Sequence, residues 1–227
     1  MTDRLRWAEQ HLDYRFDDPT LLEQALTHRS ASKHNNERLE FLGDALLNFV
    51  IANRLFELHP QNSEGELSRL RAFLVRGSTL ADIGRALGIE AQLILGPGEL
   101  RSGGGRRDAA LANGLEALLG AILLDGGFAA AEACVGKLFA DRLATLPDAD
   151  SLKDAKTRLQ EWLQGRGRLP PDYTVESALG EPHKQTFTVI CSLGYGQRVS
   201  RGSGTSRRKA EQNAAQKLLA ILISENK

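Results

Sequence analysis

The 227-residue chain has little of several features that would assign it to a particular class. It has two cysteines, Cys134 and Cys191, in different halves of the sequence. One disulfide between them is possible, but two free thiols in a reducing compartment fit better. No signal peptide opens the chain, and no apolar run approaches the roughly 18–20 residues of a membrane span. We therefore expect a cytoplasmic protein without membrane contact.

Net charge is also absent, because 29 Lys and Arg balance 29 Asp and Glu. The balance hides an asymmetry between two parts of the chain. Residues 1–147 hold 16 basic and 20 acidic side chains, a net charge of −4, and residues 148–227 hold 13 and 9, a net charge of +4. Such a division suggests two tasks. The basic part could bind a polyanion, and the acidic part could hold a metal ion.

The first two thirds of the sequence are predicted to be helical, without a strand of any length. Asp18 before Pro19 is typical of a helix N-cap followed by a first-turn proline. Ser63 and Glu66 have the spacing of a capping box. A flexible glycine-rich loop is expected at 95–105. Helices are predicted over about 18–26, 35–59, 66–87, 107–124 and 127–144.

The pattern changes after 146–150, and we place a linker at 148–152. Beyond it, apolar and polar residues alternate as they do in strands. The expected order is a helix at 154–165, strands at 173–177, 185–193 and, more weakly, 197–201, and a closing helix at 205–223. The predicted fold is an all-α domain at 1–147 followed by a small α+β domain, ordered α-β-β-β-α, at 153–224.

Three carboxylates fall on one face of the helix predicted at 35–59. At about 100° per residue, Glu37, Glu40 and Asp44 lie within an arc of about 60°. A solvated acidic face is the usual interpretation of such a pattern. Against it, no lysine lies one turn away to offset the repulsion, and apolar neighbours predict a largely buried helix: Leu39, Phe41, Leu42, Ala45, Leu46 and Leu47. Buried, crowded carboxylates need a cation, and Mg²⁺ prefers hard oxygen ligands.

The helix predicted at 107–124 carries a further carboxylate, Glu116, among apolar residues. A buried, unpaired carboxylate is strongly destabilising. Asn113 precedes it by three residues, so both side chains point to a similar side of the helix. If the two helices pack face to face, these residues join Glu40 and Asp44 around one point. The four side chains would then form a metal cage between helices.

The segment 36–44, Asn-Glu-Arg-Leu-Glu-Phe-Leu-Gly-Asp, resembles the signature segment of the ribonuclease III family. Other segments agree with that family in order: 26–30, 63–66, 95–104 and 115–120. The resemblance covers nearly the whole chain, and the domain order is that of the short bacterial form. It implies a double-strand-specific endoribonuclease that leaves 5′-phosphate and 3′-hydroxyl ends. Ribosomal RNA precursors and other structured transcripts are the implied substrates.

The same resemblance implies that Glu40, Asp44, Asn113 and Glu116 bind Mg²⁺, for which Mn²⁺ could substitute. It also implies that Asp44 and Glu116 are the catalytic residues. One common form of the family has Asp where this sequence has Asn113. An amide still offers a neutral oxygen, but the cage loses one negative charge. We therefore expect weaker metal binding rather than loss of activity.

Three more acidic residues, Glu37, Glu64 and Glu99, stand where the family has acidic side chains near its catalytic valley. They are candidates for substrate or auxiliary roles. For Glu64, a favourable charge at a helix N-terminus explains its position equally well. For Glu99, within the glycine-rich loop, a functional role and a merely structural one likewise both stay open.

Cations open the last predicted helix, where they oppose the helix macrodipole at about 0.3–1 kcal/mol each. A solvated basic cluster is the alternative, but this placement favours a bound polyanion. The region resembles the double-stranded-RNA-binding domain, and aromatic residues form no evident platform for stacking single-stranded bases. The resemblance implies RNA contacts at Thr157, Gln160 and Glu161 on the first helix, at His183 in the loop after the first strand, and at Ser206, Arg207, Arg208 and Lys209.

Two other functions stay open. A non-catalytic, duplex-RNA-binding regulator with a degenerate nuclease domain is favoured by Asn113, whereas the intact Glu40, Asp44 and Glu116 argue against it. A metal-dependent hydrolase of small phosphates leaves the basic domain without a purpose. Nucleophilic catalysis finds little support because the histidines are scattered.

No nucleotide cofactor is expected, because the glycine-rich loop lacks the Gly-Lys-Ser/Thr of a P-loop. A homodimer is implied by the family, and two symmetric sites suit the two strands of a duplex. The apolar surface around Phe41 is a candidate interface, although Phe41 could equally belong to the core.

Overall fold

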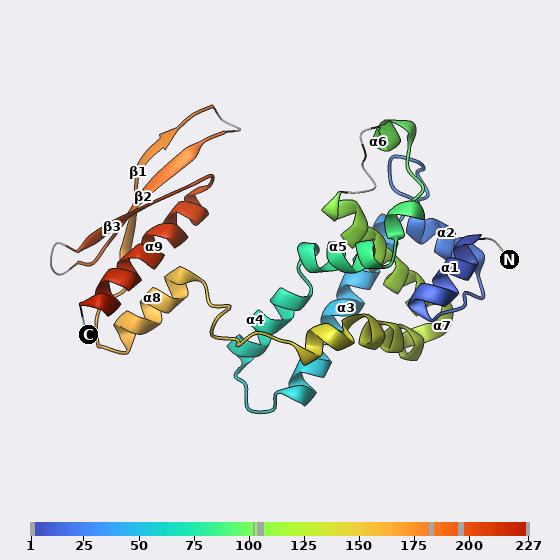
Figure 1. The fold of residues 1–227 in the computed structure, drawn as a ribbon, viewed down its shortest axis with the longest axis horizontal. Coiled ribbons are helices and arrows are strands. Elements are labelled where there is room, and N and C mark those ends of the chain that lie inside the picture. The colour runs from blue at the N-terminus through green and yellow to red at the C-terminus, as the bar shows by residue number, and fades with distance from the viewer. Residues whose placement is uncertain (1–2, 102, 104–106, 182–183, 195–197, 226–227) are drawn as a thin grey trace. The chain divides into compact units, whose positions relative to one another are not determined.

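The computed structural model describes residues 3–101, 103, 107–181, 184–194 and 198–225. The chain divides into two compact units, Met1–Leu152 and Lys153–Lys227 (Figure 1). The first unit is helical, and the second has the order α-β-β-β-α. The predicted fold class is confirmed.

In the helical unit, α3 packs along α7, and the shorter helices surround this pair (Figure 1). Fully buried leucines of both helices form the centre of the core, among them Leu47, Leu115 and Leu118. The elements are α1 (Asp3–Leu12), α2 (Pro19–Leu26), α3 (Glu37–Leu58), α4 (Glu64–Leu74), α5 (Gly77–Ala86), a short 3-10 turn (Ile89–Ala91), α6 (Pro97–Arg101) and α7 (Asp108–Ala144).

Side-chain caps begin two of these helices where the sequence predicts them. The Asp18 carboxylate accepts the Thr20 N–H at 2.9 Å, and a proline occupies the first turn of α2. At α4, the Ser63 N–H donates to the Glu66 carboxylate at 2.7 Å, and the Ser63 hydroxyl accepts the Glu66 N–H. Both caps satisfy N–H groups that have no partner within the helix. The predicted capping box is confirmed.

The predicted helix at 66–87 is in fact two helices, α4 and α5. Arg76 has extended backbone dihedrals, with φ −64° and ψ 146°. The buried Thr79 hydroxyl donates to the Phe73 carbonyl and accepts from the Arg76 side chain, each at 3.2 Å. These side-chain bonds compete with the helical ones and stabilise a turn. The predicted glycine-rich loop likewise contains a short helix, α6.

The break predicted near residues 125–126 falls at Gly127, which has φ 78° within an otherwise continuous α7. Next to it, the Asp125 carboxylate accepts the Tyr14 hydroxyl at 2.7 Å and the backbone N–H groups of Asp17 and Asp18. A Cβ at Gly126 would lie 2.3 Å from the Tyr14 hydroxyl. The absence of a side chain at Gly126 therefore lets the segment between α1 and α2 pack against α7 and donate hydrogen bonds to Asp125.

Among the described helices, α7 is long and apolar enough to cross a membrane by length and composition alone, although the sequence lacks an uninterrupted apolar run. Its best window has a mean hydropathy of 1.7 and is 44% buried within the structure. A buried core helix meets the same criteria. The packing of α7 on α3 and α5 agrees with that interpretation.

The segment predicted as a linker, 148–152, is folded onto the helical unit. Ala149 is 5% exposed, and Leu152 packs against the helical core. Arg69 of α4 donates from Nε to the Ala149 carbonyl at 3.1 Å, and its Nη2 lies 3.7 Å from the Asp150 carboxylate. The division between the units thus falls directly after this segment, at Leu152 and Lys153.

The second unit places two helices against one face of an antiparallel sheet with strand order β1-β2-β3. The closing helix approaches the sheet closely at Gly202, where a Cβ would lie 2.3 Å from the Ala210 carbonyl oxygen. Cys191 is buried in this unit and Cys134 in the other, and both are free thiols. The elements are α8 (Ala155–Gln164), β1 (Asp172–Leu179), β2 (Thr186–Ser192), β3 (Val199–Gly204) and α9 (Arg207–Ser224).

Candidate active site and duplex-binding surface

Two glycines bring α3 and α7 into backbone contact. A Cβ on Gly43 would lie 1.7 Å from the Glu116 carbonyl oxygen, and one on Gly120 would lie 2.2 Å from the Leu39 carbonyl oxygen. Side chains larger than hydrogen would therefore force the helices apart. Because Gly43 lies next to Asp44, the crossing brings the acidic residues of α3 to those of α7.

Burial and neighbouring charge alter the pKa values of the carboxyl groups at this crossing. Burial, followed by the charges of Asp44 and Glu40, raises the pKa of Glu116 to about 7. Burial and Glu37 raise the pKa of Glu40, while a hydrogen bond to the Asn113 side chain opposes the rise. The structure thus brings the four predicted metal ligands into one region.

The cluster does not form a closed metal site. Within the described part of the chain, no group of three or more His, Cys, Asp and Glu side chains is arranged to hold a metal ion. The Asp44 carboxylate accepts the Asn48 side-chain N–H at 2.8 Å. Three carboxylates and one carboxamide are hard oxygen donors, so the donor set fits Mg²⁺ by its chemistry.

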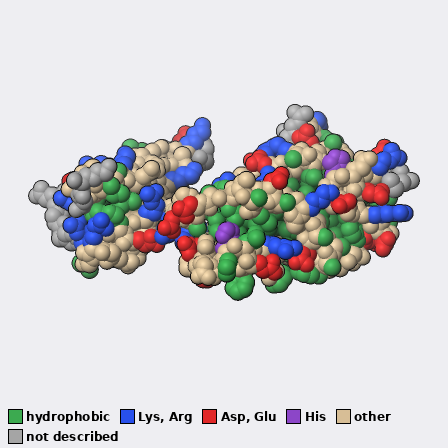
Figure 2. All heavy atoms as spheres, turned by 60° about the horizontal axis from the view of Figure 1, so that its bottom comes forward, with side chains coloured by type: hydrophobic (Ala, Val, Ile, Leu, Met, Phe, Trp, Pro, Cys, Tyr) green, Lys and Arg blue, Asp and Glu red, His purple; other side chains and the backbone are tan. Residues whose placement is uncertain are grey.

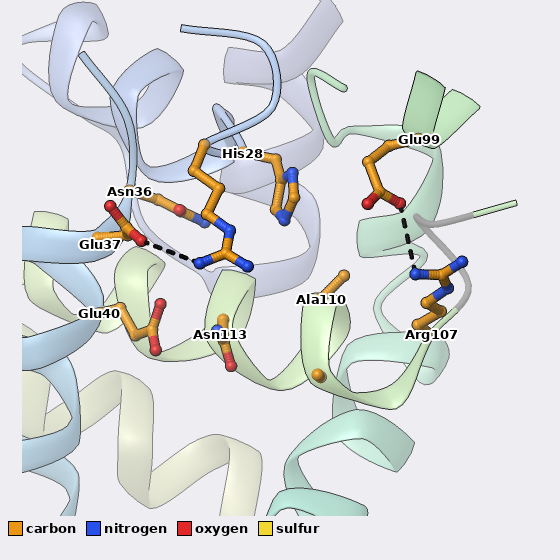
Figure 3. Close-up of a pocket in the computed structure, with 10 residues that line it drawn as sticks. His28, Asn36, Glu37, Glu40, Glu99, Arg107, Ala110 and Asn113 are labelled. Atoms are coloured by element: carbon orange, nitrogen blue, oxygen red, sulfur yellow. Dashed lines mark ion pairs between the residues drawn. The ribbon is translucent and has the colours of Figure 1, made fainter. Parts of the chain in front are cut away.

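Beside the cluster lies a cavity of about 430 Å³ (Figure 3). Glu40 and Asn113 line one side of it, whereas Asp44 and Glu116 do not line it. Two ion pairs frame the cavity: Arg29 Nη1 to Glu37 Oε1, and Arg107 Nη1 to Glu99 Oε2, each at 3.7 Å. The other lining residues are His28, Asn36, Ala109 and Ala110.

Of the three auxiliary acidic residues, Glu37 and Glu99 line this cavity and Glu64 does not. Glu64 is the first residue of α4, and its carboxylate accepts the Ser68 hydroxyl at 2.9 Å. The sequence did not reveal that Arg29 pairs with Glu37. The loop that carries Arg29 reaches α3 only through the tertiary fold, so no helical spacing indicates the pair.

The expectation that α3 is largely buried is wrong for one of its faces. Phe41 is 78% exposed, Phe49 59% and Phe56 70%. Apolar side chains also reach the surface of the helical unit in Figure 2. The three phenylalanines recur about every two turns, so they line one side of the helix. Apolar composition alone could not distinguish this face from the core.

On the second unit, the Ser206 hydroxyl caps α9 by accepting the Lys209 N–H at 3.2 Å. Arg208 and Lys209 are exposed and line a surface hollow of about 610 Å³ together with Ser206. Arg207, by contrast, pairs with Glu211 at 2.9 Å, and Lys156 of α8 binds the same carboxylate at 2.6 Å. Part of the predicted basic cluster is therefore already neutralised.

The predicted contacts on α8 differ in their surroundings. Gln160 is exposed, whereas Thr157 is half-buried and its N–H bonds to the Asp154 cap at 2.9 Å. Glu161 pairs with Lys153 at 2.8 Å. His183 lies outside the described residues.

Comparisons with known proteins agree with both units. The model of the family described as Ribonuclease-III-like matches residues 18–143, and that of the double-stranded RNA binding motif matches residues 155–222. Ribonuclease 3 of Nitrosococcus oceani is 54% identical over 228 residues, which cover 100% of this chain and 98% of that protein. Ribonuclease 3 of Pasteurella multocida is 52% identical over 223 residues, 98% of this chain and 99% of the other.

Among solved structures, the nuclease domain of ribonuclease III from Campylobacter jejuni is similar to the helical unit. It is 38% identical, has a TM-score of 0.61, and covers 64% of this chain and 100% of that domain. The chain belongs to the ribonuclease III family. It is an endoribonuclease of double-stranded RNA, with a nuclease unit followed by a double-stranded-RNA-binding unit, from a family that generally uses a divalent metal.

Proposed function

We propose that this chain hydrolyses phosphodiester bonds in double-stranded RNA with Mg²⁺ held by Glu40, Asp44, Asn113 and Glu116, leaving 5′-phosphate and 3′-hydroxyl ends. The observation that carries the proposal is the backbone contact of α3 and α7 at Gly43, which brings the half-buried Glu116 beside Asp44 and Glu40. A divalent cation would favour the ionised form of all three carboxylates and turn their repulsion into coordination. Mn²⁺, also an oxygen-seeking cation, would substitute.

Each residue has a distinct task in this proposal. When bound, the metal supplies an activated water and stabilises charge on the phosphate. Asp44 and Glu116 hold this centre from α3 and α7, respectively, and are the catalytic residues. Asn113 orients the Glu40 carboxylate through its amide. Glu37 and Glu99 act at the cavity beside the centre, and Glu64 acts as an auxiliary acidic residue from the start of α4.

The basic unit, which we place at 153–224, supplies affinity for the duplex. Arg208 and Lys209 contact phosphates, together with Ser206 at the start of α9. Gln160 and Thr157 contact 2′-hydroxyls in the minor groove. His183, Arg207 and Glu161 remain candidates for RNA contact, the last two by exchanging their ion pairs. The substrates are structured cytoplasmic transcripts, including precursors of ribosomal RNA.

The exposed phenylalanines of α3 support a homodimer of the nuclease domain, which we place at 1–147. Burial of Phe41, Phe49 and Phe56 against a second copy would remove a large apolar surface from water. One solved structure of the Campylobacter jejuni nuclease domain shows flexibility in a region involved in dimer formation of that domain. Sedimentation that showed only a 24.8 kDa monomer of the present chain would contradict this part of the proposal.

The central experiment is cleavage of a long RNA duplex with Mg²⁺ by the full chain and by the Asp44→Ala variant. We expect the variant to lose activity by about a thousandfold or more, because several kcal/mol of transition-state stabilisation depend on the metal. Asp141→Ala, which removes an exposed carboxylate of α7, is the matched control. Binding without cleavage by the unaltered chain would instead support a non-catalytic regulator.

A further inference from the structure

The loop between α2 and α3 is held in place although it lies at the surface. The His28 N–H donates to the Ile94 carbonyl at 2.9 Å, and the Gly96 N–H donates to the Ser30 hydroxyl at 3.0 Å. The packing at Gly96 is so close that a Cβ there would lie 2.1 Å from the Ser30 carbonyl oxygen. The residue between these two anchors, Arg29, therefore starts from a fixed backbone position.

The side chain of Arg29 is nevertheless loosely held. It is 72% exposed, and its Nη1 lies 3.7 Å from the Glu37 carboxylate, whose side chain is 56% exposed. That separation is too long for a hydrogen bond, and an exposed ion pair of this kind contributes little to stability. The fold thus fixes the backbone of Arg29, while its guanidinium group can exchange one ion-pair partner for another at a small cost in free energy.

The cavity in front of Arg29 has room for part of a nucleotide. Its volume of about 430 Å³ lies in the ordinary range of small-molecule sites, and both Arg29 and Arg107 line it (Figure 3). Glu37, Glu40 and Glu99 line it as well, and they would repel the RNA backbone. A strand can approach this acidic region only where cations meet its phosphates, and guanidinium groups match phosphate oxygens in geometry.

We propose that Arg29 is a positioning residue that binds a backbone phosphate of the RNA strand beside the cleavage site, exchanging its ion pair with Glu37 for that phosphate. Glu37 is then a competitor that holds Arg29 in the absence of RNA. This inference rests on the proposed function, because it needs a duplex bound across the carboxylate cluster.

The test is a double-mutant cycle on binding of the full chain to a long RNA duplex without divalent metal, over a series of salt concentrations. Arg29→Ala should weaken binding about tenfold and lower the slope of log affinity against log salt by about one. Glu37→Gln should tighten binding, because it releases Arg29. The double variant should bind like Arg29→Ala alone. Arg38→Ala, on the exposed surface of α3, is the matched control and should bind like the unaltered chain.

Two other outcomes would overturn the inference. An unchanged affinity and salt slope in Arg29→Ala would show that no phosphate meets this residue. If Arg29 merely neutralises Glu37, the double variant should regain the affinity lost in Arg29→Ala. Failure of the unaltered chain to bind the duplex would instead refute the proposed function itself. Unfolding curves of the variants distinguish these outcomes from a folding defect, since exposed substitutions usually change stability by less than about 0.5 kcal/mol.

Discussion

The two units of this chain both gather like charges, but they compensate them differently. In the helical unit, Glu116 sits beside Asp44 and Glu40, and burial together with their charges raises its pKa to about 7. In the basic unit, Arg207 and Lys156 both pair with Glu211, which offsets part of their charge within the fold. The first cluster is left with excess charge in a small volume, and the second with charge spread over a surface.

This difference indicates the kind of ligand that each unit suits. A compact excess of negative charge is best relieved by a small, doubly charged cation. An exposed surface with Arg208 and Lys209 suits an extended polyanion, whose affinity is the sum of several weak contacts. Substitutions that alter either arrangement should therefore have effects of different size and kind.

The largest effect is expected from Gly43→Ala, which separates the helices that form the acidic cluster. The added Cβ would overlap the Glu116 carbonyl oxygen, so the free energy of unfolding should fall by about 3 kcal/mol, with a severe loss of cleavage. Chemical denaturation measures the first quantity. Gly136→Ala in α7 is the control, because nothing lies within 4 Å of its Cβ, and we expect slight stabilisation there. Equal stability of the two variants would contradict the close crossing.

A smaller effect is expected from Glu116→Gln in metal-free buffer. The raised pKa means that the folded chain holds the Glu116 proton more tightly than the unfolded chain does. The free energy of unfolding should therefore decrease as the pH rises from about 4.5 through 7. After allowance for partial solvent exposure, removing the charge should stabilise the protein by about 1–3 kcal/mol at pH 8.

Denaturation at several pH values, with and without Mg²⁺, measures this effect. Asp141→Asn, an exposed carboxylate on the same helix, should leave the pH dependence unchanged. Mg²⁺ should stabilise the unaltered chain at pH 8 more than the Glu116→Gln variant. A pH dependence that survives in Glu116→Gln would show that another group causes it.

A moderate effect on the Mg²⁺ dependence of cleavage is expected from Asn113→Asp in the acidic cluster. A fourth carboxylate increases the excess negative charge and should lower the Mg²⁺ concentration for half-maximal cleavage several-fold. Without metal, the same variant should be less stable than the unaltered chain, because the hydrogen bond from Asn113 to Glu40 is lost. Identical Mg²⁺ titrations for the two proteins would rule out a role of position 113 at the metal.

The smallest effects are expected at single cations of the basic surface. Lys209→Ala should weaken duplex binding several-fold and lower the salt slope by about one. Arg207→Ala should change the slope less, because Arg207 is already paired with Glu211. Fluorescence anisotropy of a labelled duplex over a salt series measures the affinity and the salt slope of both variants. A larger slope change for Arg207 would mean that RNA displaces Glu211.

Local signals allowed much of the fold to be predicted from the sequence. The Ser63–Glu66 capping box and the Asp18 cap involve neighbours in sequence, so their residue types determine the geometry. The α-β-β-β-α order of the second unit was predicted because the spacing of its apolar residues changes between the period of a helix and the alternation of a strand. The turn at Arg76 was missed because it depends on Thr79, whose side chain bonds back to Phe73 only in the folded chain.

The candidate site was predictable as a set of residues but not as a geometry. The spacing of Glu40 and Asp44 gave their helix face, whereas the distance to Glu116 depends on the contact at Gly43. Arg29 gave no signal, because it reaches Glu37 from a loop rather than from the same helix. Phe41 was left open between a surface interface and the core, because an apolar surface and an apolar core have the same composition.

The folded segment at 148–152 also determines how the two units are joined. Leu152 packs against the core of the nuclease unit, while Lys153 pairs with Glu161, and Asp154 caps α8. The connection is therefore short, because Leu152, which packs on the helical unit, is followed directly by Lys153, which bonds within the second unit. With so short a connection, a duplex bound by the basic unit would stay at an effective concentration on the order of millimolar for the nuclease unit. Cleavage of a bound RNA would then compete with its dissociation from the chain.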